Sequence, residues 1–321
     1  MVIVVAILIS SCASTLYIAS AAEENRTIPN SQMTLSSSTQ KKDIIDIGAW
    51  APSKFHLEKM PSIKQVNEAI HSLVGQGFSE YYFVMRDFNN STETKATEQL
   101  LKSADNTNNL KIIIILLPPS ESGNYGAYSN ANYDWKGWIV YFNSLKKIHP
   151  SSFLGFAIDD FNAVHGVRRL YVMNNIMYFM SSSNFSGALH NKRKDIQFYP
   201  VMYMETSGFD TLKRNYGKFL SGIILVNTPP IVLSSSSSSY YNLTQLNGNI
   251  STLSKMFENK PLKYIIYPPN PQNGKLSANT SRQLTDILLT TSRLFNGIIV
   301  YVRTENSIIQ DFLHNLQRQH N

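Results

Sequence analysis

The chain has 321 residues, of which 43% are hydrophobic, and its formal net charge is +7 at pH 7. This hydrophobic share is enough for a globular core, and the length allows one large domain or two ordinary ones. The positive charges are scattered, and the densest group is Lys192-Arg193-Lys194. Without a basic stripe that carries interleaved aromatic residues, the composition does not indicate a nucleic-acid partner.

The first residues have the features of a targeting segment. Met1 to Ile18 are largely apolar and uncharged, and Ala19-Ser20-Ala21 has the small-x-small form of a signal-peptidase site. A basic region before the apolar run is missing, so residues 1–22 are expected to be a cleaved signal peptide or a retained N-terminal anchor. Residues 23–42 are expected to be a disordered tether, because Ser, Thr, Asn and Gln dominate there without periodicity.

The only cysteine, Cys12, lies inside the leader and follows Ile9-Ser10-Ser11. This order resembles a lipobox, whose cysteine is lipidated after cleavage, and a bystander thiol is the alternative. In either case the rest of the chain contains no disulfide, so core burial must stabilise its fold. Membrane attachment is expected through the N-terminal segment if that segment is retained, or through Cys12 if that residue is lipidated.

Asn-x-Ser/Thr sequons support export of the chain. Examples begin at Asn25, Asn90, Asn184, Asn242, Asn249 and Asn279. Together with the leader they predict a glycoprotein that is secreted or held at the extracytoplasmic cell surface.

From residue 43 onward, apolar runs of strand length alternate with segments of helical spacing. Eight strands are expected, at Asp43–Trp50, Tyr81–Asp87, Lys111–Leu117, Phe153–Asp160, Gln197–Glu205, Ser221–Asn227, Lys263–Tyr267 and Gly297–Arg303. Helical spacing recurs after the first strand, ahead of the fourth, ahead of the eighth and after it. Eight such units over residues 43–321 predict one α/β domain, a closed (β/α)8 (TIM) barrel. An open doubly wound sheet is disfavoured because no Gly-rich phosphate turn follows the first strand.

The fourth predicted strand ends in two adjacent carboxylates, Asp159 and Asp160. Because side chains alternate between the faces of a strand, the bulky Leu154, Phe156 and Ile158 are expected to meet the helices. Gly155, Ala157 and Asp159 would then look inward, so that Asp159 points into the mouth of the barrel. An acid at the carboxyl end of a barrel strand is typical of an active site. The alternative is that Asp160 caps the following segment.

Polar and aromatic residues close the other predicted strands. Carboxylates, Tyr and Trp around one rim suit a carbohydrate, because aromatic rings stack on the apolar faces of sugars and carboxylates transfer protons. The candidate catalytic residues are Asp159, Glu205 and Asp160. The candidate substrate-binding residues are Trp50, Arg86, Asp87, Tyr203, Asn227, Tyr267 and Arg303. The alternatives are that Asp159 pairs with Arg86, that Asp87 and Asp160 are orienters or loop caps, and that Glu205 is a solvated strand end.

The segment Gly155-Phe156-Ala157-Ile158-Asp159-Asp160-Phe161 resembles a strand of glycoside hydrolase barrels. The nearest comparison is with family 18 chitinases, whose strand reads Asp-Gly-Phe-Asp-Ile-Asp-Trp-Glu. Alignment of the Gly-Phe pairs matches Asp159 with the last Asp of that motif. The catalytic Glu falls on Phe161, however, so the chitinase mechanism does not transfer. Trp135-Lys136-Gly137-Trp138 and the Ile-Asp-Asp-Phe strand also resemble secreted barrel-like proteins that have a Trp-rich helix before such a strand.

The resemblance and the residues at the strand ends together predict a glycoside-hydrolase-like enzyme. Asp159 would act as electrostatic stabiliser, nucleophile or base, and Glu205 or Asp160 as proton donor. The alternative is a non-catalytic surface barrel that binds a glycan or a neighbouring envelope protein. No cofactor is expected, and no metal site either, because a Cys cluster and His-Glu-x-x-His spacing are both missing. The expected partner is a polysaccharide or glycan, and the oligomeric state is left open.

Overall fold

The computed structural model describes residues 46–50, 62–107, 110–116, 134–159, 161, 196–204, 208–226, 243–258, 260–266 and 294–301. These residues form a closed barrel of eight strands in chain order, β1 to β8. Every neighbouring pair is parallel, and β8 closes the ring against β1. The predicted fold class is therefore confirmed. The expected leader, tether and Cys12 lie outside the described residues.

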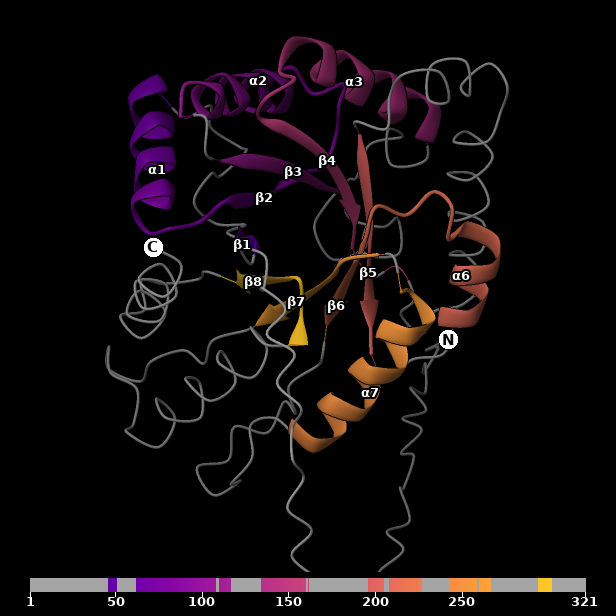
Figure 1. Ribbon diagram of the computed structural model, residues 1–321. Coiled ribbons are helices and arrows are strands. Elements are labelled where there is room, and N and C mark those ends of the chain that lie inside the picture. The colour runs from indigo at the N-terminus through magenta and orange to yellow at the C-terminus, as the bar shows by residue number, and fades with distance from the viewer. Residues whose placement is uncertain are drawn as a thin grey trace, which may run out of the picture. The chain divides into compact units, whose positions relative to one another are not determined.

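All eight predicted strands are present. Their bounds are β1 Asp46–Trp50, β2 Glu80–Met85, β3 Lys111–Leu116, β4 Phe153–Ile158, β5 Gln197–Tyr203, β6 Ile223–Val226, β7 Leu262–Ile266 and β8 Gly297–Tyr301. The helices described between them are α1 Ile63–Gly75, α2 Ser91–Asp105, α3 Trp135–Ile148, α6 Phe209–Tyr216 and α7 Leu243–Met256. They lie around the outside of the strands in Figure 1. None of the helices in the described part of the chain is long and apolar enough to span a membrane.

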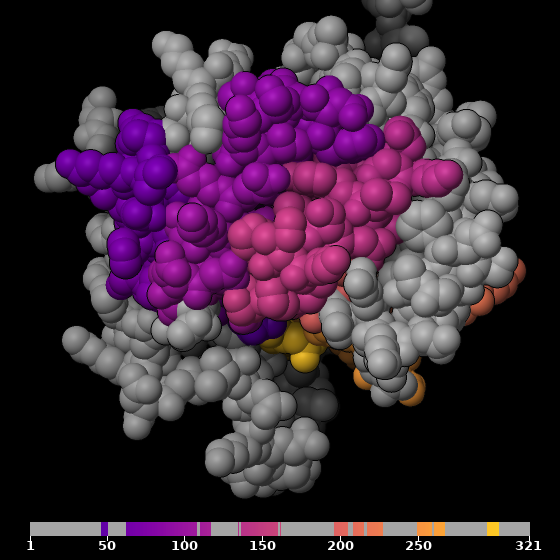
Figure 2. Space-filling model, turned by 90° about the horizontal axis from the view of Figure 1, so that it is seen from above, coloured from indigo at the N-terminus to yellow at the C-terminus, as the bar shows by residue number. Residues whose placement is uncertain are grey.

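Local signals explain where the first helices begin. Ser62 caps α1, accepting a hydrogen bond from the Gln65 backbone while the Gln65 side chain accepts one from the Ser62 backbone. Asn90 caps α2 by accepting from the backbone N–H groups of Thr92 and Glu93. The helices α1 and α2 contact each other, and they form adjoining parts of the surface in Figure 2. These caps fix the points at which the chain leaves the barrel edge and turns back along its outside.

Alternation along the strands divides the core into two layers. The outer layer packs between strands and helices, and it includes Phe156 and Ile158 of β4. The inner layer fills the barrel, and it includes Ala157. The prediction for Leu154 is wrong, because its side chain packs against the inner layer instead of the helices. The register explains this: Ile112 pairs with Phe153 but Ile113 pairs with Gly155, so Leu154 is an extra residue that shifts the alternation.

Stacked aromatic rings join α3 to the barrel wall. Phe142 stacks on Phe156 at 4.8 Å between ring centroids, and Phe156 stacks on Phe198 of β5 at 4.9 Å. Trp138 is 1% exposed and stacks on Phe142. Through these rings α3 packs against the strand that leads to Asp159.

Candidate functional site

The described structure includes half of the predicted site residues, all at the carboxyl edge of the barrel. These are Asp159, Trp50, Arg86, Asp87 and Tyr203. The other five, Asp160, Glu205, Asn227, Tyr267 and Arg303, lie outside the described residues.

Asp159 directly follows β4 and is half-buried. Its backbone N–H continues the strand ladder by donating to the Leu116 carbonyl at 2.9 Å. Since Ile158 belongs to the outer layer and Ala157 to the inner one, alternation assigns Asp159 to the inner side. That its carboxylate looks into the barrel mouth stays a prediction.

Trp50 occupies a deeper position than expected for a sugar-stacking platform. It is 4% exposed and belongs to the inner layer. Its ring stacks on Tyr82 at 6.4 Å and 13°, and it meets Tyr301 at 6.1 Å and 49°. Trp50 is therefore buried beside its register partner Tyr301, and its indole ring is not open to a sugar.

Two half-buried tyrosines end other strands at the carboxyl edge. Tyr203 ends β5, Tyr301 ends β8, and both pack against the inner layer. Tyr301 was missed in the sequence because the eighth strand was expected to run on to Arg303. The signal that identifies it is alternation, since Gly297, Ile299 and Tyr301 share one face of β8.

Arg86 and Asp87 are bound to helix α2. Both backbone N–H groups donate to Glu93 Oε2, at 2.8 and 3.0 Å, and Arg86 Nε donates to Glu93 Oε1 at 3.1 Å. Glu93 is 2% exposed. The Asp87 carboxylate accepts from the backbone of Asn89 at 2.8 Å, as a loop cap does. The described partner of Arg86 is thus Glu93, a residue that the sequence analysis did not single out.

A second polar cluster lies inside the amino-terminal end of the barrel. Lys263 is 1% exposed; it forms a hydrogen-bonded ion pair with Glu80 and lies 3.3 Å from an oxygen of Asp46. Tyr82 donates from its hydroxyl to Glu80 at 2.8 Å, and Lys263 Nζ lies 5.1 Å from the ring centroid of Tyr199. Burial raises the pKa of Glu80, although the nearby Lys263 ammonium opposes the shift. Burial likewise raises the pKa of Tyr82 well above its ordinary value.

Glycine makes room for this cluster. A Cβ at Gly297 would lie 3.1 Å from Cγ of Lys263, tighter than ordinary van der Waals contact. The cluster joins strands from the two halves of the chain and fills the end of the barrel opposite Asp159. We assign this buried ion pair to the stability of the fold, because the active sites of such barrels lie at the carboxyl end of the strands.

Asp105, the last residue of α2, forms hydrogen bonds to the segment that leads into β4. It accepts hydrogen bonds from Ser151 Oγ at 2.5 Å, the Ser152 backbone at 3.1 Å and His149 Nδ1 at 2.7 Å. Partial burial raises the pKa of Asp105, but these hydrogen bonds outweigh it, so the pKa lies below its ordinary value.

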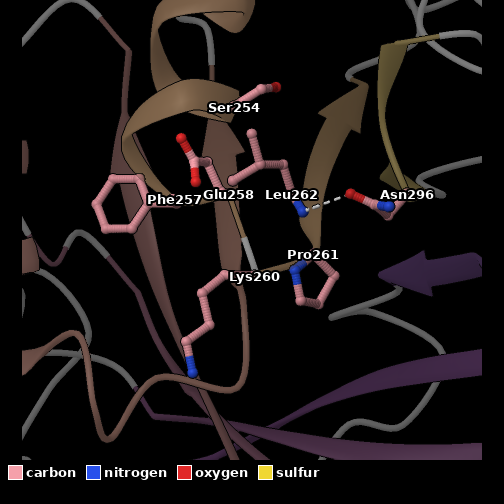
Figure 3. Close-up of a pocket in the computed structure, with 7 residues that line it drawn as sticks. All are labelled: Ser254, Phe257, Glu258, Lys260, Pro261, Leu262 and Asn296. Carbon is pink, nitrogen blue, oxygen red and sulfur yellow. Dashed lines mark hydrogen bonds between the residues drawn. The ribbon is translucent and has the colours of Figure 1, made fainter.

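A surface hollow also lies at the amino-terminal end, where β7 begins (Figure 3). Its volume is about 370 Å³. In its wall Asn296 accepts a hydrogen bond from the Leu262 backbone at 3.0 Å, and nearby Lys260 donates to the Leu220 carbonyl at 2.5 Å. Both groups support the backbone. Within the described ranges, no three His, Cys, Asp or Glu side chains come together in a group that could hold a metal ion.

No protein-family model matches the chain, and no curated protein sequence matches it either. Solved structures do. A maltogenic alpha-amylase of Thermotoga neapolitana superimposes with a TM-score of 0.53 and 10% identity, over 86% of this chain and 77% of that one. The chain is a TIM barrel.

Two further glycoside hydrolases share this fold. A Streptomyces cattleya enzyme of family GH5, solved in complex with Manβ1-4GlcNAc, gives a TM-score of 0.54 and 11% identity over 86% and 81% of the two chains. The GH99 endo-alpha-mannosidase of Bacteroides thetaiotaomicron gives 0.51 and 11% over 81% and 86%. At these identities the similarity establishes the TIM-barrel fold alone.

Proposed function

We propose that this barrel engages an extracellular carbohydrate at its carboxyl mouth, in the manner of a glycoside hydrolase. The observation that carries the proposal is the position of Asp159, half-buried at the end of β4 on the inner side of the strand. Neighbouring β5 ends in Tyr203, so a carboxylate and a phenol ring lie at adjacent strand ends. The structural neighbours named above are an amylase, an endo-alpha-mannosidase and a GH5 enzyme bound to a disaccharide, which supports a glycan partner.

Tyr301 completes the proposed sugar site. In a ring of eight strands in chain order, β8 is four places from β4, so Tyr301 and Asp159 end opposite strands. A pyranose ring could stack on one tyrosine while its hydroxyl groups donate to the carboxylate. Trp50 would support Tyr301 from the neighbouring strand β1, since the two residues are register partners and their rings are 6.1 Å apart.

For catalysis, Asp159 is assigned as nucleophile, base or electrostatic stabiliser. The proton donor is assigned to Glu205, two residues after the end of β5, or to Asp160. The two carboxyl groups must lie about 5–5.5 Å apart for a retaining reaction, or about 6.5–9.5 Å for an inverting one. Asn227, Tyr267 and Arg303, which follow β6, β7 and β8, are assigned to substrate binding with Arg86 and Asp87.

One observation favours the second candidate, a non-catalytic glycan-binding barrel. Phe161, which aligns with the catalytic Glu of family 18 chitinases, is 3% exposed and packs edge-on against Phe198 in the outer layer. That position faces the helices, so an acid there could not reach a substrate in the mouth. The binding candidate requires Tyr203, Tyr301 and Asp159 but no proton donor.

A polysaccharide panel that records both binding and release of reducing ends separates the two candidates. Asp159→Asn is expected to abolish product release while it leaves the fold intact. Asp210→Asn removes an exposed carboxylate from the first turn of α6 and is the matched control. If Asp159→Asn releases product at the wild-type rate from every glycan that is cleaved, the catalytic assignment is wrong. Binding without product release from any glycan would establish the second candidate.

We further infer that the chain is exported, glycosylated and held near a membrane by its N-terminal segment or Cys12. The sequons at Asn90 and Asn249 fall in the described residues and differ in context. Asn90 is exposed at the start of α2, whereas Asn249 is half-buried within α7 next to Ile250, which is 2% exposed. Mass spectrometry of the protein from its own host tests this inference. It should find a processed N-terminus or a lipid on Cys12, and a glycan on Asn90 in preference to Asn249.

A further inference from the structure

A cation at the carboxyl edge of the barrel is held by a buried acid. Arg86 directly follows β2, and its Nε donates to Glu93 Oε1 at 3.1 Å. The side chain of Glu93 is 2% exposed, whereas that of Arg86 is 34% exposed. The pair therefore joins a buried carboxylate to a guanidinium that solvent can reach.

Glu93 has other groups that stabilise its negative charge. Its Oε2 accepts hydrogen bonds from the backbone N–H groups of Arg86 and Asp87, at 2.8 and 3.0 Å. Glu93 also lies in the first turn of α2, where the helix dipole favours a carboxylate. Because these groups already compensate the buried charge, the contact with Nε serves chiefly to fix the direction of the Arg86 side chain.

Arg86 has donors beyond this contact. A guanidinium carries five N–H groups, and Glu93 accepts from Nε alone. Within the part of the chain that the structure describes, Glu93 is the only carboxylate that forms an ion pair with Arg86. The two Nη groups form the fork that matches a carboxylate or another oxyanion. They are the atoms through which Arg86 can bind a ligand.

The strand register places Arg86 level with Asp159. Met85 pairs with Leu116, and Leu116 pairs with Ile158. Arg86 and Asp159 each follow this row by one residue, and one strand lies between them. Neighbouring strands are about 4.8 Å apart, so the two backbones are separated by about 10 Å. A short oligosaccharide can reach both positions.

Alternation assigns the two residues to the same side of the barrel wall. Tyr82 belongs to the inner layer, and Val84 packs against it. Arg86 is the next residue of this series, on the inner side, as Asp159 is in β4. The geometry therefore offers a sugar a cation and a carboxylate at one level of the mouth.

The charge of the whole chain favours the same kind of ligand. Its formal net charge is +7 at pH 7. A net positive charge attracts polyanions and raises their rate of association, whereas a neutral polysaccharide gains nothing from it.

We propose that Arg86 selects an acidic glycan, by binding a carboxylate or sulfate group of the sugar through its two Nη groups. This inference rests on the proposed function and adds the substrate class to it. Arg86 is then a residue that determines specificity, and Glu93 is a positioning residue that acts through it.

Binding of the full chain to matched pairs of immobilised polysaccharides tests the proposal. Two pairs differ in a carboxylate: polygalacturonate against its methyl ester, and hyaluronan against its carboxyl-reduced form. A third pair, dextran sulfate against dextran, differs in sulfate. The readout is the ratio of the two affinities within a pair, which cancels any unfolded fraction of a variant because both members meet the same preparation.

The test variant is Arg86→Gln, and the matched control is Arg214→Gln. Arg214 is an exposed arginine in the last turn of α6, so the control removes the same charge at the other end of the barrel. The wild type should prefer the anionic member of at least one pair. Arg86→Gln should lower that ratio about tenfold or more, because it removes a hydrogen bond between two charged groups. Arg214→Gln should keep it.

Two kinds of failure are distinguishable. If the wild type binds both members of every pair equally, or if Arg86→Gln keeps the ratio or Arg214→Gln loses as much, Arg86 does not select the ligand, although glycan binding stands. If the wild type binds no polysaccharide of this set and none of the broader panel, the proposed function fails and this inference fails with it. Preference in the carboxylate pairs or in the sulfate pair identifies the anionic group.

Discussion

Replacement of Lys263 by Met should destabilise the barrel strongly. Lys263 is 1% exposed and is the described cation nearest to Glu80, which is itself 3% exposed. Met fills a similar volume without a charge, so the Glu80 carboxylate would stay buried with only the Tyr82 hydroxyl as a described partner. An uncompensated buried charge costs about 3–5 kcal/mol, and this is the expected loss in free energy of unfolding, measured by urea denaturation at pH 7.

Two comparisons isolate the reason for that loss. Lys64→Met alters an exposed lysine that lies 3.8 Å from Glu68, and such surface pairs contribute about 0–1 kcal/mol. The double variant Lys263→Met, Glu80→Gln removes both buried charges and should be more stable than Lys263→Met alone.

The pH dependence of the Lys263→Met variant carries a definite sign. The folded state already raises the pKa of Glu80 above its ordinary 4.5, and removal of the ammonium raises it further. A folded-state pKa above the unfolded one means that stability increases as the pH falls through the folded value, until about the ordinary value is reached. The reasoning is refuted if Lys263→Met is within about 1 kcal/mol of the wild type, or if the double variant is no more stable than the single one.

Three further predictions concern residues that position the rim and the strands. Because the folded state lowers the pKa of Asp105 below 3.8, the ionised carboxylate stabilises the fold above that pH. Asp105→Asn should therefore lower the free energy of unfolding in urea, and the difference in this free energy between variant and wild type should shrink as the pH falls below 3.8. Gly155→Ala would push a Cβ into the neighbouring backbone of β5 and should cost at least about 1 kcal/mol in thermal unfolding, whereas Gly75→Ala has open space and should be neutral or stabilising. Glu93→Ala leaves two backbone N–H groups without their acceptor and should cost about 1–3 kcal/mol in urea, while the exposed Glu98→Ala should cost little.

The sequence was sufficient to predict the barrel because each strand of a (β/α)8 fold is buried on both faces. Such strands are short apolar runs, and the run that ends at Asp159 shows this most clearly. The inward direction of Ala157 followed from alternation alone. The direction of Leu154 did not follow from alternation, because the bulge at this residue depends on how β4 pairs with β3. The register between two strands cannot be deduced from the sequence of either strand alone.

The site was predictable only where a side chain's role is set locally. Glu93 could have been found, since it follows the cap Asn90 by three residues and reaches back to the strand end. The pairing of Lys263 with Glu80 could not, because 183 residues separate them and only closure of the ring brings them together. A tryptophan at a strand end is equally compatible with a buried core residue and an exposed platform for a sugar, and packing against Tyr82 shows that Trp50 is buried.

Hydrogen exchange of the full chain with and without a glycan that it binds tests the central claim most directly. If the carbohydrate lies in the carboxyl mouth, the bound glycan should slow exchange in the peptides that contain Asp159, Tyr203 and Tyr301. Exchange at the beginnings of β2 and β7, around Glu80 and Lys263, should stay unchanged. Slowed exchange at that amino-terminal end alone, with the three strand ends unaffected, would contradict the account.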